Sequence, residues 1–137
     1  MAKTPEHGTG KQVVILEDDP EIAEMLRIVV EAMGVAVHAT SDGRSGLELV
    51  RKIRPDGVIL DIMMPKMNGY EVCAAIQSDP NLAHVPIMVV TGLVETQDSK
   101  TEEEWRNRLS VADFVVKPLN MDTIGSRLRK LLQIPDA

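Results

Sequence analysis

The chain has 137 residues, a formal net charge of −6 and a single cysteine, Cys73. This length fits one domain, and an acidic balance without a basic run argues against direct binding to nucleic acid. One cysteine excludes a disulfide framework and favours a reducing compartment. No stretch is apolar enough to cross a membrane, and the N-terminus lacks the apolar segment of a signal peptide. We therefore expect a single-domain cytoplasmic protein.

Strands and helices alternate through residues 11–134, after a short flexible leader predicted over residues 1–10. Apolar residues repeat with helical spacing in some segments and form short β-branched runs in others. The polar, acidic stretch between the fourth and fifth strands is helical by propensity. The predicted order is strand 12–16, helix 20–33, strand 35–40, helix 43–53, strand 57–60, helix 69–78, strand 87–91, a strand ending at Lys117, and helix 121–132.

This alternation predicts an α/β fold. The strand segments are apolar throughout, which is typical of parallel strands that helices cover on both faces. Short connections between them favour right-handed crossovers. We expect a flavodoxin-like doubly wound (βα)5 domain, with a five-stranded parallel sheet of order 2-1-3-4-5.

Two of the apolar strands end at acidic residues. Asp61 follows one of them, and Glu17 and Asp18 follow another. Ligands of open α/β sheets bind outside the carboxyl ends of the strands, so these acids lie where a site is expected. Asp19, directly before Pro20, instead has the pattern of a helix N-cap followed by proline at the first helical position.

Clustered carboxylates need a compensating charge, because two unit charges about 4 Å apart repel by roughly 4 kcal/mol at an effective dielectric near 20. The cluster could raise a carboxylate pKa, pair with a lysine, or bind a hard cation such as Mg²⁺. Two more strands end at Thr91 and at Lys117, and Lys117 precedes Pro118 in a pattern that suggests a cis peptide bond. Each ending alone has an ordinary structural explanation. Four complementary endings together indicate a functional site.

The chain resembles the receiver domains of two-component response regulators over roughly residues 11–134. The resemblance rests on the order and spacing of a small set of motifs. They are the Glu17–Asp18 pair, Asp61 followed by Ile62 and then Met-Met-Pro-Lys-Met-Asn-Gly, Thr91, and Lys117–Pro118.

The resemblance implies a role for each of these residues. Asp61 would be the phosphoacceptor, Asp18 and Asp61 would bind Mg²⁺ directly, and Glu17 would bind it through water. The Met63 backbone carbonyl would complete the metal shell. The phosphoryl group would be paired by Lys117, and the switch would be formed by Thr91 and Phe114.

The function that follows is a phosphorylation-activated switch of a two-component system or phosphorelay. The phosphoryl donor would be a phosphohistidine on a sensor histidine kinase or a histidine phosphotransfer protein. A downstream effector would bind the face between the fourth and fifth helices. The chain would act as a stand-alone, chemotaxis-regulator-like receiver, and it would catalyse only its own phosphorylation and dephosphorylation.

Two departures from the family pattern stand out. Thr91 and Lys117 are 26 positions apart (117 minus 91), a few more than receivers usually have, and the extra residues fall in the fourth-helix region. Ser110 and Val111 replace a small Gly-Ala pair that commonly precedes the last strand, which affects the geometry expected around Phe114.

Three other functions fit the sequence less well. Flavin binding would place a phosphate beside the acids after the first strand, which would repel it. A haloacid-dehalogenase-like phosphatase needs a second acid two positions after its nucleophile, and that position is Met63. The stronger alternative is a pseudo-receiver, which would use the same fold as a phosphorylation-independent interaction module.

Overall fold

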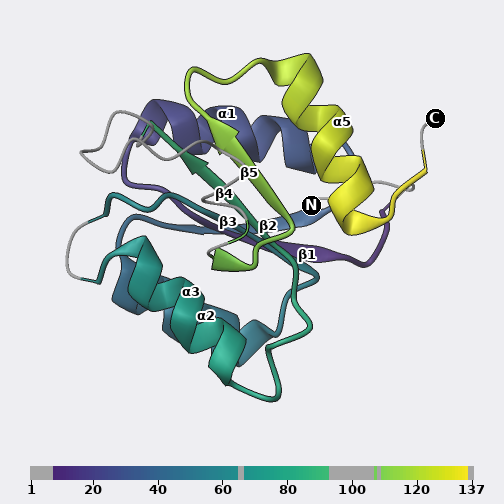
Figure 1. Ribbon diagram of the computed structural model, residues 1–137. Helices are drawn as coiled ribbons and strands as arrows, with labels where there is room; N and C mark the ends of the chain where they lie inside the picture. The colour runs from purple at the N-terminus through teal and green to yellow at the C-terminus, as the bar shows by residue number, and fades with distance from the viewer. Residues whose placement is uncertain (1–7, 65–66, 93–106, 108, 136–137) are drawn as a thin grey trace.

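The computed structural model describes residues 8–64, 67–92, 107 and 109–135. Within these residues, a parallel sheet of order β2-β1-β3-β4-β5 has α1 and α5 on one face and α2 and α3 on the other (Figure 1). The predicted fold and strand order are confirmed. The elements are β1 Gln12–Leu16, α1 Pro20–Glu31, β2 Ala36–Thr40, α2 Gly43–Ile53, β3 Gly57–Leu60, α3 Gly69–Ser78, β4 Ile87–Thr91, β5 Asp113–Val116 and α5 Met121–Leu132.

The predicted bounds differ from these only at element ends. Helix α1 stops at Glu31, two residues early, because the chain turns there into Gly34, whose φ of +82° is in the left-handed region. Strand β5 ends at Val116 rather than at Lys117. Nearly all of the stretch expected to be helical between β4 and β5 lies outside the described residues.

The core consists of two apolar layers, one on each face of the sheet. Along β1, Val13 and Ile15 pack toward α1 and α5, whereas Val14 and Leu16 pack toward α2 and α3. All four side chains are fully buried. The sheet is therefore a water-free support for the loops that follow the carboxyl ends of its strands.

Each described helix begins at a side chain that accepts hydrogen bonds from its first turn. The N-caps are Asp19, Asp42, Asn68 and Asn120 for α1, α2, α3 and α5. Asp19 accepts from two backbone amides, which confirms its predicted capping role, and Asn68 forms a reciprocal capping box with Glu71. These caps fix the loops that leave the carboxyl ends of the strands.

Ser110 adopts a left-handed conformation just before β5, with φ of +56°. The Gln77 side chain holds this turn by donating to the carbonyl oxygens of Leu109 (2.7 Å) and Ser110 (2.9 Å). A glycine would adopt the same conformation without a Cβ clash. Serine at position 110, where the family commonly has glycine, therefore strains the backbone just before β5.

Replacing Ser110 with glycine should stabilise the protein by about 1 kcal/mol, because the left-handed conformation costs a residue with a Cβ about that much. Urea unfolding of the wild type and of Ser110→Gly measures the difference. The matched control is Ser126→Gly on the exposed face of α5, which should lose roughly half a kcal/mol through lower helix propensity. A loss of stability in both variants would contradict the strain assigned to Ser110.

Candidate functional site

The strand ends are brought into line by backbone hydrogen bonds that continue the sheet ladder one residue past each strand. They run from Glu17 N to Thr40 O (3.1 Å), from Asp61 N to Leu16 O (2.9 Å) and from Lys117 N to Thr91 O (2.9 Å). The predicted site residues of β1, β3, β4 and β5 therefore meet at one edge.

Asp61 lies at the centre of this edge and is only 4% exposed. Its Oδ1 accepts a hydrogen bond from the Met63 backbone amide (3.0 Å), and its Oδ2 accepts one from Lys117 Nζ (3.1 Å). Two donors on different loops thus fix the orientation of the carboxylate. This is the arrangement expected of a nucleophile that must meet its target in line.

The backbone around Asp61 is held by a close approach of α3. Gly69 N donates to Ile62 O (2.8 Å), and a Cβ on Gly69 would lie 2.5 Å from Ile62 Cα and 2.7 Å from Asp61 O. Only glycine fits there. Gly43 at the start of α2 has the same role toward the loop after Asp61, because a Cβ there would overlap the Met67 carbonyl. The sequence gives no signal of this role of Gly43, since a glycine after an N-cap does not indicate a distant contact.

Lys117 supplies the counter-charge of the site. Its Nζ lies 3.1 Å from Asp61 Oδ2 and 3.1 Å from Glu17 Oε1. The Lys117–Pro118 peptide bond is cis, as the sequence suggested. One ammonium thus bridges two buried carboxylates that come from different strands.

The two charges respond to burial in different ways. Burial raises the pKa of Glu17 from 4.5 to about 7, and the Asp61 charge adds to this rise, while the Asp19 amide and Lys117 oppose it. Burial lowers the pKa of Lys117, but its contacts with Asp61 and Glu17 outweigh burial and raise it overall. The lysine stays charged, whereas Glu17 is poorly compensated.

Glu17, Asp18 and Asp61 have the geometry of a cation site. One carboxylate oxygen from each lies within 4.8 Å of the others. Glu17 Oε1 is buried and lies 3.1 Å from Lys117 Nζ, an ammonium that Glu17 shares with Asp61. Carboxylate oxygens are the ligands of hard cations, so this cluster fits Mg²⁺. Asp19 is turned away to cap α1.

Thr91 and Phe114, the predicted switch residues, are both buried. Thr91 is inaccessible to solvent, and no described residue hydrogen-bonds to its Oγ1. Phe114 is 1% exposed and packs in the core layer between the sheet and the helices α2 and α3. Its ring is thus already inside in this structure, so an inward rotation does not start here. The switch role remains a prediction.

A buried aspartate beside an acidic pair, at the carboxyl edge of a flavodoxin-like sheet, is the arrangement that the sequence predicts for a receiver domain. Comparison with known sequences agrees: the response regulator receiver domain family matches residues 13–129. The chain belongs to this family.

Curated relatives extend beyond the chain. It is 35% identical over 123 residues to the DNA-binding response regulator MtrA of Mycolicibacterium smegmatis, covering 90% of this chain and 51% of MtrA. It is 38% identical over 125 residues to the probable transcriptional regulator ycf27 of Guillardia theta, covering 91% of this chain and 46% of ycf27. The chain thus spans about half the length of these relatives.

Solved structures of similar length share the fold. The receiver domain of a signal transduction histidine kinase from Syntrophus aciditrophicus has a TM-score of 0.79 and 28% identity, covering 90% of this chain and 91% of that one. The chemotaxis response regulator CheY4 of Vibrio cholerae has a TM-score of 0.77 and 28% identity, covering 90% and 99%. None of the described helices is both long and apolar enough to cross a membrane.

Asp18 and Asp19 should separate metal binding from folding. Asp18→Ala should weaken Mg²⁺ binding by at least about tenfold, because it removes a ligand of the acidic cluster. Asp19→Ala should leave Mg²⁺ affinity almost unchanged but lower the free energy of unfolding by about 1 kcal/mol, because it removes an N-cap. Mg²⁺ titrations and urea unfolding distinguish the two roles, and the reverse pattern would show that the pair is misassigned by one residue.

Glu17 should make the metal-free protein less stable as pH rises. Its pKa is raised by burial to about 7, so its contribution to stability is complete below about pH 4.5 and is lost as pH passes 7. The unfolding free energy of Glu17→Gln minus that of the wild type should therefore increase between about pH 5 and pH 8 in the presence of chelator.

The control for this measurement is Glu48→Gln on the exposed face of α2, for which the difference should be flat across the same range. Added Mg²⁺ should reduce the difference at the high-pH end, because the cation compensates the Glu17 charge. A flat difference for Glu17→Gln would contradict the charge burial described above.

Proposed function

We propose that Asp61 accepts a phosphoryl group from a phosphohistidine, and that the chain thereby transmits the signal of a two-component system or phosphorelay. The observation that carries this proposal is the buried Asp61 carboxylate, fixed at both oxygens by the Met63 amide and Lys117. A carboxylate that only ended a strand would not need two hydrogen-bond donors to fix its orientation.

Transfer begins with an oxygen of Asp61 attacking the phosphorus in line. The bond from phosphorus to the histidine nitrogen breaks, and the imidazole leaves with the bonding electron pair. Lys117, which already lies 3.1 Å from Asp61 Oδ2, pairs with a phosphoryl oxygen. The Thr91 hydroxyl, unpartnered among the described residues, hydrogen-bonds to another.

Mg²⁺ would be held by Asp18, Asp61, the Met63 backbone carbonyl and, through water, Glu17. It would offset the repulsion between the carboxylates and the incoming phosphoryl oxygens. Support for this assignment comes from the acidic cluster and from the buried Glu17 carboxylate, whose compensating ammonium is shared with Asp61. The chain would catalyse only its own phosphorylation and dephosphorylation.

The response to phosphorylation would pass through Thr91 toward Phe114. Val89 and Phe114 are register partners on β4 and β5, and Thr91 lies two residues further along the same face of β4. Movement of Thr91 toward the phosphoryl group would therefore change the packing space of the Phe114 ring. An effector would read that change on the face between the fourth and fifth helices, of which the fourth-helix part lies outside the described residues.

The proposed cellular setting rests on the reduced cysteine and on the acidic charge of the chain. The donor would be a sensor histidine kinase or a histidine phosphotransfer protein in the cytoplasm, where the buried Cys73 thiol stays reduced. The acidic surface supports recognition of proteins rather than direct binding of nucleic acid. Relatives such as MtrA are named as DNA-binding regulators, so a DNA-binding function would belong to the other part of such a protein. The simpler proposal is that the chain acts as a stand-alone receiver.

Incubation with Mg²⁺ and acetyl phosphate should add one phosphoryl group to the intact mass of the protein. Asp61→Asn should abolish the gain, because an amide cannot form the acyl phosphate. Asp122→Asn on the exposed first turn of α5 is the control and should be phosphorylated normally. Phosphorylation that persists in Asp61→Asn would overturn the assignment, and unphosphorylated wild type would favour the pseudo-receiver.

A further inference from the structure

Met63 is the most exposed of the large apolar side chains that the structure describes. Its exposed fraction is 61%, compared with 52% for Ile28 and 44% for Met121. Methionine is among the residues most often buried in proteins, yet the Met63 side chain belongs to neither apolar layer of the core. Packing of the core therefore does not explain an apolar side chain at this position.

The backbone of Met63 is fixed beside the phosphoacceptor site. Its amide donates to Asp61 Oδ1 (3.0 Å), and the Ile62 carbonyl before it accepts from the Gly69 amide (2.8 Å). The side chains on either side, Ile62 and Met64, are buried in the core. A chemical change in the Met63 side chain would therefore leave these contacts in place and alter only the solvent-facing surface next to Asp61.

Met63 is the apolar member of the exposed surface around Asp61. Among the described site residues, Glu17 and Thr91 are buried, whereas Asp18 and Met63 are exposed. Water that approaches Asp61 from the solvent therefore passes the Met63 side chain. A thioether is only a weak hydrogen-bond acceptor and orients water poorly.

Other sulfur atoms of the described chain are better protected from oxidants. Cys73 is 1% exposed, and burial raises the pKa of its thiol to about 11, so the reactive thiolate is scarce. Three methionines are also buried, namely Met33, Met64 and Met88. Because oxidation of sulfur follows exposure, Met63 and Met121 are the side chains that an oxidant reaches first.

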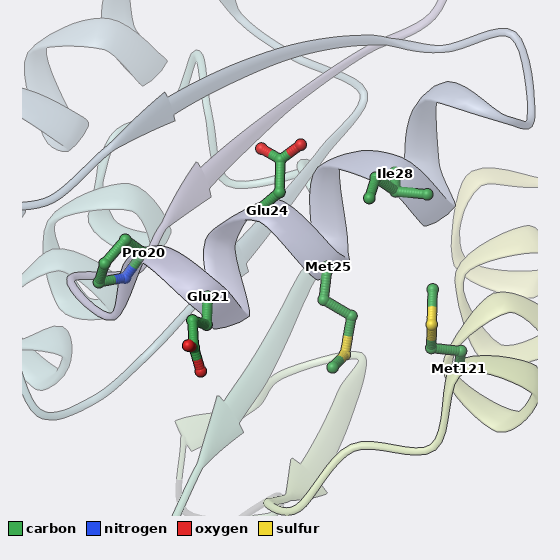
Figure 2. Close-up of a pocket in the computed structure, with 6 residues that line it drawn as sticks. All are labelled: Pro20, Glu21, Glu24, Met25, Ile28 and Met121. Carbon is green, nitrogen blue, oxygen red and sulfur yellow. The ribbon is translucent and has the colours of Figure 1, made fainter.

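Met121 offers an internal comparison for Met63. It lines a groove of about 460 Å³ between α1 and α5, where it faces Met25 and Ile28 (Figure 2). Within the part of the chain that the structure describes, the side-chain oxygens of Asp61 are hydrogen-bonded to Met63 and Lys117 and not to Met121. Oxidation of Met121 should therefore be visible in the mass of the protein without affecting the chemistry at Asp61.

We propose that Met63 is a redox modification site, at which hydrogen peroxide converts the thioether to a sulfoxide and thereby shortens the life of phosphorylated Asp61. The sulfur attacks one peroxide oxygen, so that an S–O bond forms and the O–O bond breaks. The other oxygen leaves as hydroxide and takes up the proton of the first to become water. Sulfur is oxidised and peroxide is reduced. The inference rests on the proposed function, because its effect concerns the phosphoryl group on Asp61.

The effect on lifetime follows from the new oxygen. A sulfoxide is polar and accepts hydrogen bonds, so it orients a water molecule on the solvent side of the acyl phosphate. This water attacks phosphorus in line, and the bond from phosphorus to the Asp61 oxygen breaks. The carboxylate leaves with the bonding electron pair, and the protons of the water stay on the released phosphate. Oxidation at Met63 thus returns the switch to its unphosphorylated state sooner.

Peptide mapping after mild peroxide treatment tests the modification itself. Oxygen should be added at Met63 and Met121 before it appears at the buried residues Met33, Met64 and Met88, and methionine sulfoxide reductase should remove it. Oxidation that spares Met63, or that reaches the buried methionines first, overturns the assignment of the site.

The lifetime is measured on protein that is oxidised, freed of peroxide, and then loaded with Mg²⁺ and acetyl phosphate. After desalting, loss of the phosphoryl group is followed by intact mass. Oxidation should shorten the half-life at least about fivefold, which is well below the roughly hundredfold effect of a fully positioned general base. Reductase treatment before loading should restore the original half-life. Met63→Gln, whose amide is a permanent acceptor, should have a short half-life without peroxide.

Two variants control for oxidation elsewhere. Met63→Leu keeps an apolar side chain without sulfur, so its half-life should be the same before and after peroxide. Met121→Leu should respond to peroxide as the wild type does, because Met63 is intact in it. Oxidised and untreated Met121→Leu should also unfold at the same temperature, which separates an effect at the site from a loss of structure.

The outcomes separate this proposal from the proposed function. An unchanged half-life in the oxidised wild type, or a peroxide effect that persists in Met63→Leu, overturns the role of Met63, while acetyl phosphate labelling of Asp61 leaves the proposed function intact. Failure of acetyl phosphate to label the untreated wild type overturns the proposed function and, with it, the effect assigned to Met63.

Discussion

The structure depends on one electrostatic compromise, the sharing of the Lys117 ammonium between Asp61 and Glu17. Three carboxylates meet at the edge of a dry sheet, and this ammonium lies 3.1 Å from two of them. At an effective dielectric near 20, each close pair of like charges costs roughly 4 kcal/mol. A single lysine cannot compensate three acids. Burial and the Asp61 charge raise the pKa of Glu17, and the cluster keeps negative charge that a cation could compensate. The domain is thus built around a charge imbalance that a bound cation would relieve.

The imbalance is tolerated because the surrounding fold is rigid. Two apolar layers bury β1, β3 and β4 almost completely, and ladder hydrogen bonds continue past the strand ends to Glu17, Asp61 and Lys117. Helix caps and the close contact at Gly69 then fix the loops. Relaxation that would separate the acids would have to break these contacts. Perturbed pKa values such as that of Glu17 cluster at functional sites.

Much of this arrangement follows from sequence patterns whose effects are local, within a few residues of the chain. Continuous apolar runs predict buried parallel strands, and Asp19 before Pro20 predicts the start of α1, because propensity and capping are local effects. Strand order and the meeting of Glu17 with Asp61 follow from the topology rules for such strands. The sequence does not reveal the close approach of Gly43 to Met67 or the burial of Phe114, since both depend on tertiary packing.

Because Lys117 is shared, events at the site are coupled. A cation that compensated Glu17 and Asp61 would weaken the hold of these carboxylates on the ammonium and would leave it freer to pair with a phosphoryl oxygen. By thermodynamic linkage, a phosphoryl group that drew Lys117 away would in turn strengthen binding of the cation. The same lysine begins the short segment that leads to Met121 at the start of α5. The metal and the phosphoryl group would therefore both act on Lys117, although each would contact different side chains.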